Sequence, residues 1–394
     1  MTARRRIAVF TGNRAEYGLQ YPILKAIDAD PRLDYFLLVG GAHLESDFGK
    51  TVAEIESDGF TVHREVEMHM QSDSLLATAQ LIGTGILSLS GILDELRPDF
   101  LVVSADRSEA FAAMITGTQL GIPTAHVEGG DYTEGGALDD SVRHAMTKLA
   151  HVHFATSEQA ADRIRRLGEE PWRVFTVGLP ALDMIAAGLF ASPDEVMAAL
   201  RLDASRPIVL FCQHSVTTEF EAAREQARPS LQVMRTLAGE GYQVVVTFPN
   251  NDAGGRGIVE ELDSLRGVEG VQIHKSLGRG RFHGLLNLIG KHGRGAFAGN
   301  SSAGIKETPA FGCPVVNIGS RQQGRLRGSN VIDVPYDARA IRAAIVRCAE
   351  DEELRAKCRT AVNPYGAGDA GPRIAEVLAT MPIDARLLQK KMTY

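Results

Sequence analysis

The amino-acid sequence predicts an α/β protein with two domains, each a parallel sheet covered by helices. The chain has 394 residues, which exceeds the size at which a single hydrophobic core usually stops growing. Short apolar runs alternate with amphipathic stretches along the chain, and this alternation favours parallel βαβ units. Glycine or an acidic residue closely follows several of the apolar runs, as is typical where strands of such sheets end.

Strand-like and helical patterns alternate in both halves. In the first half the apolar runs cover residues 7–10, 36–39, 100–103 and 124–127. Helical patterns lie between them, for example at residues 75–96 and 109–120. In the second half the strand-like runs cover residues 208–212, 243–247, 271–274, 296–298 and 315–318.

A helical, less sheet-like region at residues 181–206 separates the two halves. We therefore expect two Rossmann-like domains that face each other across a cleft. The first covers residues 1–190 and the second residues 191–370. Residues 371–394 are expected to form a closing helix and tail.

Composition and charge exclude several classes of function. The formal net charge is -7, whereas a nucleic-acid binder needs Lys and Arg clustered on one face. The basic run at residues 4–6 is short and is interpreted as a solvated flank of the first strand. We find no apolar run of about 18–20 residues and no signal-peptide layout. The four cysteines form no CxxC pair, which is typical of a cytoplasmic protein with reduced thiols. We expect neither a nucleic-acid partner nor a membrane.

The predicted architecture indicates where a ligand would bind, because ligands of open parallel sheets lie beyond the carboxyl ends of the strands. After the first strand, Gly12 permits a tight turn and Arg14 begins a helix. Arg14 is either a surface residue or a phosphate ligand. The three-glycine spacing of a dinucleotide fingerprint is absent, so we expect no NAD cofactor.

Acidic residues follow two other strands of the first half. Asp106 is either a helix N-cap or a catalytic group. Glu128 precedes two glycines rather than a helix, so capping does not explain it, and a glycine-rich loop then leads to Asp139. Carboxyl groups crowded into one pocket raise each other's pKa, which can supply a general base and a general acid near neutral pH.

A metal site is the alternative use of this region. His126 lies near Glu128, and His151 and His153 alternate along an apolar stretch, so a set of two histidines and one carboxylate is formally possible. Strand histidines are more often packed in the sheet, and no HxxE or HxxxH spacing supports ligation. We therefore expect no metal.

In the second half, Ser301 and Ser302 follow a strand and open a helix. Free amides at a helix start can bind phosphate oxygens, although a serine N-cap is the plainer interpretation. Glu307, expected further inside the same helix, could accept hydrogen bonds from ribose hydroxyls. His214 also follows a strand, and Arg321 belongs to a group of three arginines that suits an anionic ligand as well as a solvated loop.

A set of short motifs runs from the first strand to the last helix. In the first half they are Gly12–Tyr17 (GNRAEY), Ala105–Arg107 (ADR), His126–Gly130 (HVEGG) and Asp139–His151 (DDSVRHAMTKLAH). In the second half they are Gln213–Thr218 (QHSVTT), Phe248–Gly254 (FPNNDAG) and Gly299–Ser302 (GNSS). Together they resemble the hydrolysing UDP-N-acetylglucosamine 2-epimerases, which include the bacterial sialic-acid-pathway enzymes and the epimerase half of the bifunctional animal enzyme.

The resemblance implies a glycosyltransferase-B-like fold in which the second domain holds most of the UDP. It implies that UDP is eliminated across C1–C2 of the sugar to give a glycal, and that water then adds to release the C2-inverted amino sugar. By similarity the catalytic residues are Asp106, Glu128, Asp139 and His214. Positions expected to contact UDP are Arg14, Arg107, Asn250, Ser301, Ser302, Glu307 and Arg321. Which acid removes the C2 proton is left open.

The implied chemistry suits these residue types. A carboxylate can remove the C2 proton, and arginine, histidine and backbone amides can neutralise the charge on the departing UDP. No hydride moves, so no redox cofactor is expected. The family is usually oligomeric, so we expect a homo-oligomer, either a dimer or a tetramer.

Three departures from the family pattern bear on the substrate. The family usually has glycine where this chain has Ala105, and Asp131 stands where many hydrolysing members have glutamate. The loop from Asp131 to Asp139 is longer than in the animal enzyme and, by the resemblance, lies beside the sugar pocket. The first expectation is UDP-N-acetylglucosamine, which would yield N-acetylmannosamine. The alternative is UDP-2,4-diacetamido-2,4,6-trideoxy-glucose.

Two other classes of function are alternatives: a glycosyltransferase of the same fold and a non-catalytic nucleotide-sugar binder. The transferase would need an acceptor site and would not require three acids around C2. The binder could keep the serines while losing the acids. The joint presence of Asp106, Glu128 and Asp139 disfavours the binder, and the long match over Asp139–His151 disfavours the transferase.

Overall fold

The computed structural model describes residues 4–45, 51–68, 75–132, 138–249 and 254–394. These residues form two compact units. Unit 1 contains the chain up to Asp183 and the last segment from Tyr365, and unit 2 contains Met184–Pro364. The sequence analysis places its boundaries near residues 190 and 371, whereas the chain passes between the two units after Asp183 and after Pro364.

Unit 1 is built on a parallel sheet of seven strands in the order β3-β2-β1-β4-β5-β6-β7. The strands are β1 (Arg5–Thr11), β2 (Leu33–Gly40), β3 (Val62–Val66), β4 (Phe100–Ser104), β5 (Thr124–Val127), β6 (Val152–Ala155) and β7 (Val174–Thr176). The sequence analysis predicts β1, β2, β4 and β5 and misses the other three. Because β4 and β5 are neighbours, their carboxyl ends lie side by side.

Helices cover both faces of this sheet. They are α1 (Arg14–Ala29), α2 (Val52–Ser57), α3 (Leu75–Leu96), α4 (Ser108–Gln119), α5 (Leu138–Leu149), α6 (Glu158–Arg166), α15 (Ala370–Thr380) and α16 (Ala385–Leu388), with the short turns η1 (Gly41–His43) and η3 (Pro171–Arg173). Ile7 and Val9 of β1 belong to a core cluster with residues of α1 and α15. Ala8 and Phe10 belong to another with residues of α3 and α4. Both faces of the central strand are therefore buried.

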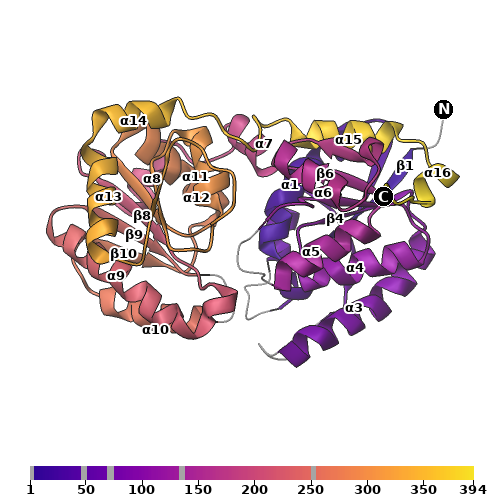
Figure 1. The fold of residues 1–394 in the computed structure, drawn as a ribbon, viewed down its shortest axis with the longest axis horizontal. Coiled ribbons are helices and arrows are strands. Elements are labelled where there is room, and N and C mark those ends of the chain that lie inside the picture. Colours follow the sequence, from indigo (N-terminus) through magenta and orange to yellow (C-terminus); the bar gives the residue numbers. More distant parts are fainter. Residues whose placement is uncertain (1–3, 46–50, 69–74, 133–137, 250–253) are drawn as a thin grey trace. The chain divides into compact units, whose positions relative to one another are not determined.

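The end of the chain completes unit 1. In Figure 1 the yellow helix α15 lies beside the indigo α1, and the two helices pack along each other. A side chain at Gly371 would lie 2.5 Å from the carbonyl oxygen of Pro22 in α1, so this close approach requires glycine. The Asp183 carboxylate accepts hydrogen bonds from the amides of Ala370 (2.9 Å) and Gly371 (2.6 Å), which holds the first turn of α15.

Unit 2 repeats the design with a parallel sheet of six strands in the order β10-β9-β8-β11-β12-β13. The strands are β8 (Ile208–Cys212), β9 (Gln243–Thr247), β10 (Val271–His274), β11 (Gly295–Gly299), β12 (Val315–Ile318) and β13 (Val331–Val334). The sequence analysis predicts all of these except β13. The two parallel α/β units confirm the predicted pair of Rossmann-like domains.

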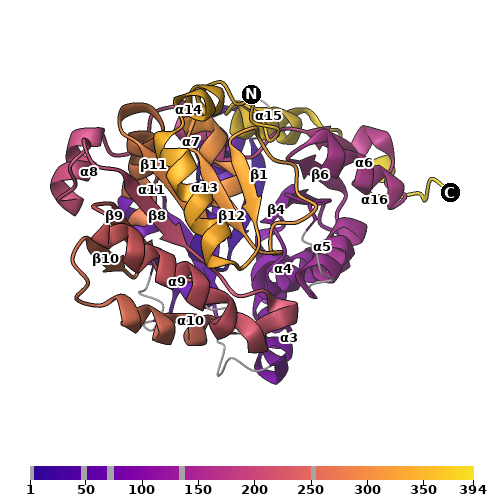
Figure 2. The same cartoon turned by 60° about the vertical axis from the view of Figure 1, so that its left-hand side comes forward.

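The helices of unit 2 also cover both faces of its sheet. They are α8 (Pro193–Leu200), α9 (Ala223–Gly239), α10 (Gly255–Leu262), α11 (Gly278–Asn287), α12 (Ala303–Lys306), α13 (Ala338–Glu350) and α14 (Glu352–Arg359), with η4 (Thr217–Ala222), η5 (Asp263–Leu265), η6 (Leu288–His292) and η7 (Thr308–Phe311). Figure 2 shows α13 in front of this sheet, where it packs on β11 and β12. Helix α7 (Ala181–Ala186) leads out of unit 1.

Helix α3 corrects one expectation. Over Leu76–Leu96 it is long and apolar enough to cross a membrane, by length and composition alone. Its Leu81, Leu89 and Leu93 nevertheless lie in a core cluster of unit 1, and the helix packs along α4. Only 28% of this apolar window is buried, and Leu76 and Leu87 are exposed, so packing within unit 1 accounts for one face of α3.

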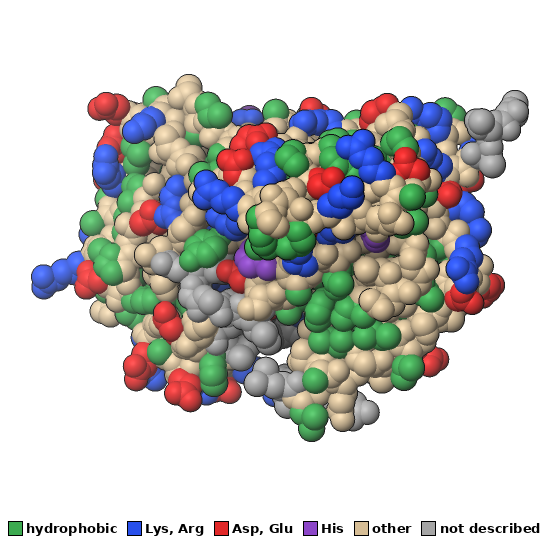
Figure 3. Space-filling model, turned by 45° about the vertical axis from the view of Figure 1, so that its right-hand side comes forward, with side chains coloured by type: hydrophobic (Ala, Val, Ile, Leu, Met, Phe, Trp, Pro, Cys, Tyr) green, Lys and Arg blue, Asp and Glu red, His purple; other side chains and the backbone are tan. Residues whose placement is uncertain are grey.

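Acidic and basic side chains are intermixed over the face of the molecule shown in Figure 3. Exposed charges of unit 1 include pairs such as Arg4–Asp34 (3.0 Å) and Arg64–Glu95 (3.3 Å). A nucleic-acid binder instead presents a concentrated basic surface. The face in Figure 3 therefore gives no support to such a partner.

Candidate active site

Two turns with positive φ follow the neighbouring strands β4 and β5. Ala105 has a φ of 61° directly after β4, and Glu128 has a φ of 65° directly after β5. This left-handed conformation costs a non-glycine residue about 1–2 kcal/mol, and such strain is concentrated at functional sites. Glycine, which the resemblance implies at the position of Ala105, would adopt this conformation without strain.

Glu128 is held tightly at the end of β5. Its backbone amide donates to the carbonyl of Phe154 at 3.0 Å, and the residue is 8% exposed. A side chain at Gly130 would lie 2.3 Å from the carbonyl oxygen of Ala160, so the turn after Glu128 needs glycine. No helix begins at these glycines, as predicted. Glu128 is therefore a buried carboxyl group that caps no helix.

Asp106 is paired with an arginine that the sequence analysis did not assign to the site. The guanidinium of Arg143 in α5 contacts the Asp106 carboxylate, a second carboxylate from Asp140 and the carbonyl oxygen of Asp131, the last at 3.1 Å. The N-cap interpretation of Asp106 is wrong, because Arg107 occupies the N-cap position of α4. Burial alone would lower the pKa of Arg143, but the surrounding carboxylates raise it above its ordinary value. Arg143 is thus a buried cation that joins α5 to the end of β4.

The first turn of α5 carries two successive carboxylates with different surroundings. Asp139 is exposed, whereas Asp140 is buried against Arg143. Acidic side chains are favourable in the first turn of a helix because they face its free amides. The predicted residues Asp106, Arg107 and Asp139 therefore belong to elements that Arg143 holds together within unit 1.

Two predicted UDP contacts cannot be placed. Asn250 lies outside the described residues. Arg14 is the first residue of α1, directly after the turn that leaves β1, but its side chain also lies outside the described part of the chain.

The histidines considered for a metal are engaged in the fold of unit 1. Nε2 of His126 lies 2.7 Å from the carbonyl oxygen of Ala105, and burial lowers the pKa of His126 to about 4, so the neutral ring donates this hydrogen bond. Nδ1 of His151 accepts from the amide of Thr124 at 3.0 Å. Among the residues that the structure describes, no group of three or more His, Cys, Asp or Glu side chains is arranged to hold a metal ion.

In unit 2 a buried asparagine links two predicted site residues. Asn300 follows β11 and is fully buried. Its side chain accepts from the amide of His214 at 2.6 Å and donates to the carbonyl of His214 at 2.9 Å. Its own carbonyl oxygen accepts from Arg321 at 3.1 Å and from Gln322 at 2.8 Å. Asn300 therefore holds His214, after β8, beside the loop that carries Arg321.

The segment after Asn300 is less helical than predicted. Helix α12 covers only Ala303–Lys306, and Glu307 ends it rather than lying inside it. Ser302 is its N-cap and makes no side-chain capping bond. The Glu307 carboxylate lies 2.7 Å from Nε2 of His283 in α11, a residue that the sequence analysis did not consider. A helix this short has few aligned amides, so it supports the phosphate interpretation less than the sequence suggested.

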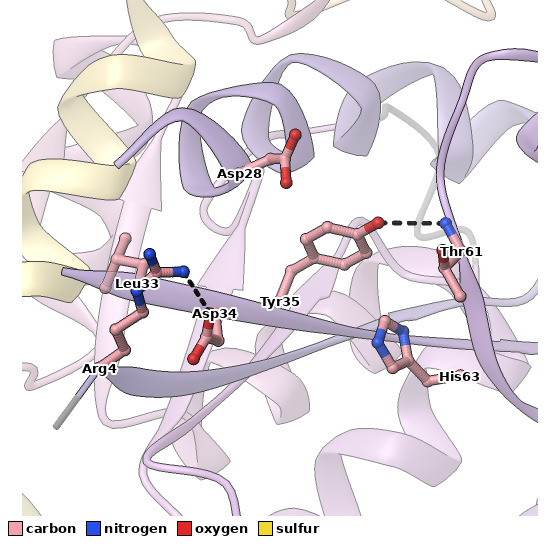
Figure 4. Close-up of a pocket in the computed structure, with 7 residues that line it drawn as sticks. All are labelled: Arg4, Asp28, Leu33, Asp34, Tyr35, Thr61 and His63. Atoms are coloured by element: carbon pink, nitrogen blue, oxygen red, sulfur yellow. Dashed lines mark hydrogen bonds and ion pairs between the residues drawn. The ribbon is translucent and has the colours of Figure 1, made fainter. Parts of the chain in front are cut away.

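The cavity in Figure 4 lies near the amino ends of β1, β2 and β3 and includes none of the predicted site residues. It is lined by Arg4, Asp28, Leu33, Asp34, Tyr35, Thr61 and His63 and has a volume of about 220 Å³. The Tyr35 hydroxyl accepts from the Thr61 amide at 3.1 Å, and Arg4 pairs with Asp34. Because ligands of parallel sheets bind at the opposite ends of the strands, this cavity is not part of the candidate site.

The chain is similar in sequence to a family of known enzymes. The family model described as UDP-N-acetylglucosamine 2-epimerase matches residues 25–379. The chain is 32% identical over 390 residues to a protein of Legionella pneumophila named UDP-N,N'-diacetylbacillosamine 2-epimerase (hydrolyzing), covering 99% of this chain and 100% of that protein. It is also 32% identical over 378 residues to a UDP-N-acetylglucosamine 2-epimerase of Neisseria meningitidis, covering 95% of each.

The fold is also similar to that of a solved structure. The crystal structure of UDP-GlcNAc 2-epimerase from Neisseria meningitidis bound to UDP-GlcNAc superimposes with a TM-score of 0.81 at 18% sequence identity. The similarity covers 95% of this chain and 99% of that chain. At this identity the likeness establishes the fold.

Proposed function

The chain belongs to the UDP-N-acetylglucosamine 2-epimerase family, and from this membership we propose that it is a hydrolysing 2-epimerase of a UDP-linked 2-acetamido sugar. The observation that carries the proposal is the group of acids around the buried Arg143, beside a strained Glu128 at the end of the neighbouring strand. A protein that only binds nucleotide sugars has no need of buried carboxylates there. The cytoplasmic location and the homo-oligomeric assembly stay predictions.

The proposed reaction has two steps. A carboxylate removes the proton from C2 while the bond between C1 and the UDP oxygen breaks, which leaves a C1–C2 double bond and free UDP. Water then adds its hydroxyl group to C1, and a proton returns to C2 from the opposite face, so the product is the free sugar with C2 inverted. Asp106, Glu128 and Asp139 are the candidates for these proton transfers.

The residues of unit 2 fit the role of holding the leaving group. UDP gains negative charge as its bond to C1 breaks, and donors placed in advance stabilise that charge without reorganising. Arg321 and His214 offer such donors, and Asn300 determines where both lie. Ser301, Ser302 and Glu307 follow Asn300 along the chain and stay proposed UDP contacts, as do Arg14, Arg107 and Asn250.

Two substrates are supported by the relatives. We propose the 2,4-diacetamido-2,4,6-trideoxy-glucose derivative as the first to assay, because the relative matched over 99% of this chain is named for N,N'-diacetylbacillosamine, which is that sugar. UDP-N-acetylglucosamine is the second, because the Neisseria relative is named for this substrate. The two sugars differ at C4 and C6, so a comparison of kcat/KM identifies the preference.

The first prediction is that turnover of the preferred substrate in deuterium oxide places deuterium at C2 of the released sugar. The new C–H bond at C2 is formed with a proton from solvent-exchanged groups, so the label follows from elimination and hydration. Mass spectrometry and proton NMR of the product measure it, with no metal or NAD added. Release of UDP with hydrogen retained at C2 would indicate simple hydrolysis or glycosyl transfer, and binding without turnover would indicate a nucleotide-sugar binder.

The second prediction concerns Asn300. We expect Asn300→Ala to weaken UDP binding by about tenfold and to destabilise unit 2 by about 1–3 kcal/mol, because the buried backbone groups of His214 lose their partners. Calorimetric titration with UDP and thermal unfolding measure the two effects. Asn330→Ala is the matched control, since Asn330 is also buried in unit 2 and donates to Thr308 (3.0 Å) and Cys313 (2.8 Å). An equal loss of UDP affinity in the control would contradict a specific role for Asn300.

A further inference from the structure

Two glutamates lie buried together in unit 1 where β1, α1 and α4 meet. Glu16 is in the first turn of α1 and is 2% exposed, and Glu109 is in the first turn of α4 and is 6% exposed. One oxygen of Glu16, Oε2, accepts a hydrogen bond from the amide of Gly12 at 2.7 Å. The other, Oε1, is buried and has no hydrogen-bond partner among the described residues. None of the three acids proposed for catalysis belongs to this pair.

Two glycines make room for the second carboxyl group. A Cβ atom at Gly12 would lie 2.5 Å from the Cβ atom of Glu109, and one at Gly41 would lie 2.9 Å from its Cγ atom. The Glu109 side chain therefore lies against the turn that leaves β1 and against η1. This packing places Glu109 against the same turn whose Gly12 amide donates to Glu16.

Burial, the Gly12 amide and three charged residues influence the pKa of Glu16. Burial, followed by the charge of Glu109, raises the pKa of Glu16 to about 8, while the Gly12 amide and Arg107 oppose this shift and Asp106 adds to it. On the side of η1, Nε2 of His43 lies 3.0 Å from the Thr11 hydroxyl, and burial lowers the pKa of His43 to about 4, so this ring is neutral. These surroundings favour the protonated form of the Glu16 carboxyl group.

We propose that Glu16 and Glu109 together hold a single proton, and that this proton limits the negative charge near Arg107, a proposed contact of the substrate's diphosphate. Arg107 and Asp106 directly precede α4, whose first turn contains Glu109. A second negative charge on the pair would attract the Arg107 guanidinium away from the ligand and repel the diphosphate. Glu16 is thus a positioning residue that acts through Arg107, and this role rests on the function proposed above.

The proposal predicts a specific pH dependence. We expect the KM of the wild-type enzyme to rise about tenfold between about pH 7.5 and pH 9.5, as Glu16 ionises, while kcat changes much less. Glu16→Gln stays neutral and can still accept from the Gly12 amide, so its KM should stay level over the same range. Glu109→Gln leaves a pair that can carry at most one negative charge, so its KM should also stay level over this range.

Calorimetric titration with UDP over the same pH range separates this role from the reaction itself. If the protein turns over no UDP-sugar, the proposed function fails, and the binding curves still test the acid pair. Profiles of wild type and Glu16→Gln that coincide up to about pH 9.5 would overturn the proposal. If Glu16→Gln does not fold, Glu109→Gln decides, because a KM that rises in that variant as it does in wild type contradicts a shared proton.

Discussion

Replacing Glu128 by Gln is expected to lower kcat by about 10²–10⁴-fold, the range typical for removal of a general acid or base. Glutamine has nearly the same shape, so the left-handed turn at Glu128 and the bond from its amide to Phe154 should persist. The amide side chain can neither take nor give a proton in the reaction. UDP binding should change little, because the proposed UDP contacts are made mainly by unit 2.

The measurement is a steady-state assay of UDP release, combined with calorimetric titration of UDP into the same preparation. Glu95→Gln is the matched control, since Glu95 is an exposed glutamate of unit 1 that pairs with Arg64, and its kcat should match the wild type. A parallel loss of turnover and of UDP affinity in Glu128→Gln would identify Glu128 as a structural residue. If deuterium still exchanges into C2 of bound substrate in this variant, another acid removes the C2 proton.

The sequence predicts the buried strands better than those at the edges. Among the predicted strands of unit 2, β8, β9, β11 and β12 are buried and their apolar runs are nearly continuous. Strand β10 is an exception, because it is a partly exposed edge strand that the sequence also predicts. By contrast, β3 and β13 lie at sheet edges and are partly exposed, so they contain polar residues that hide the pattern. Strand β6 is fully buried, but two histidines flank or interrupt its apolar run.

Some residues of the candidate site could be predicted from the sequence and others could not. Asp106 and Glu128 are recognisable because their position after a strand is a local property of the chain. Arg143 and Asn300 were missed because their role depends on partners far along the sequence, such as Asp106 and His214. The expected helix beyond Ser302 stops early because Pro309 has no amide hydrogen to continue the α-helical hydrogen bonds, and the chain goes on as the 3-10 turn η7.

Loss of the Glu169 carboxylate is expected to destabilise unit 1 by about 3–5 kcal/mol, as when one partner of a buried ion pair is removed. Its side chain is 1% exposed and lies 2.6 Å from Lys148, 2.7 Å from Lys390 and 3.1 Å from His153. Lys390 also donates to the carbonyls of Lys148 (2.7 Å) and Ala150 (2.6 Å), where α5 ends. In Glu169→Leu the charge of Lys390 would stay buried without its carboxylate, and the C-terminal tail would lose its attachment to α5.

Urea unfolding measures this effect in unit 1 specifically, because Trp172 is the single tryptophan of the chain and lies in η3. Burial alone would raise the pKa of Glu169, but hydrogen bonds from His153, Lys148 and Lys390 lower it to about 2. A lowered folded-state pKa means that this stabilisation is complete above about pH 4.5 and is lost as the pH falls towards 2. The difference between wild type and Glu169→Leu should therefore shrink over that range. The control Glu158→Gln, at an exposed position in α6, should stay within about 0.5 kcal/mol of wild type. An equally small effect of Glu169→Leu at pH 7 would show that hydrophobic packing, and not this carboxylate, holds the tail against α5.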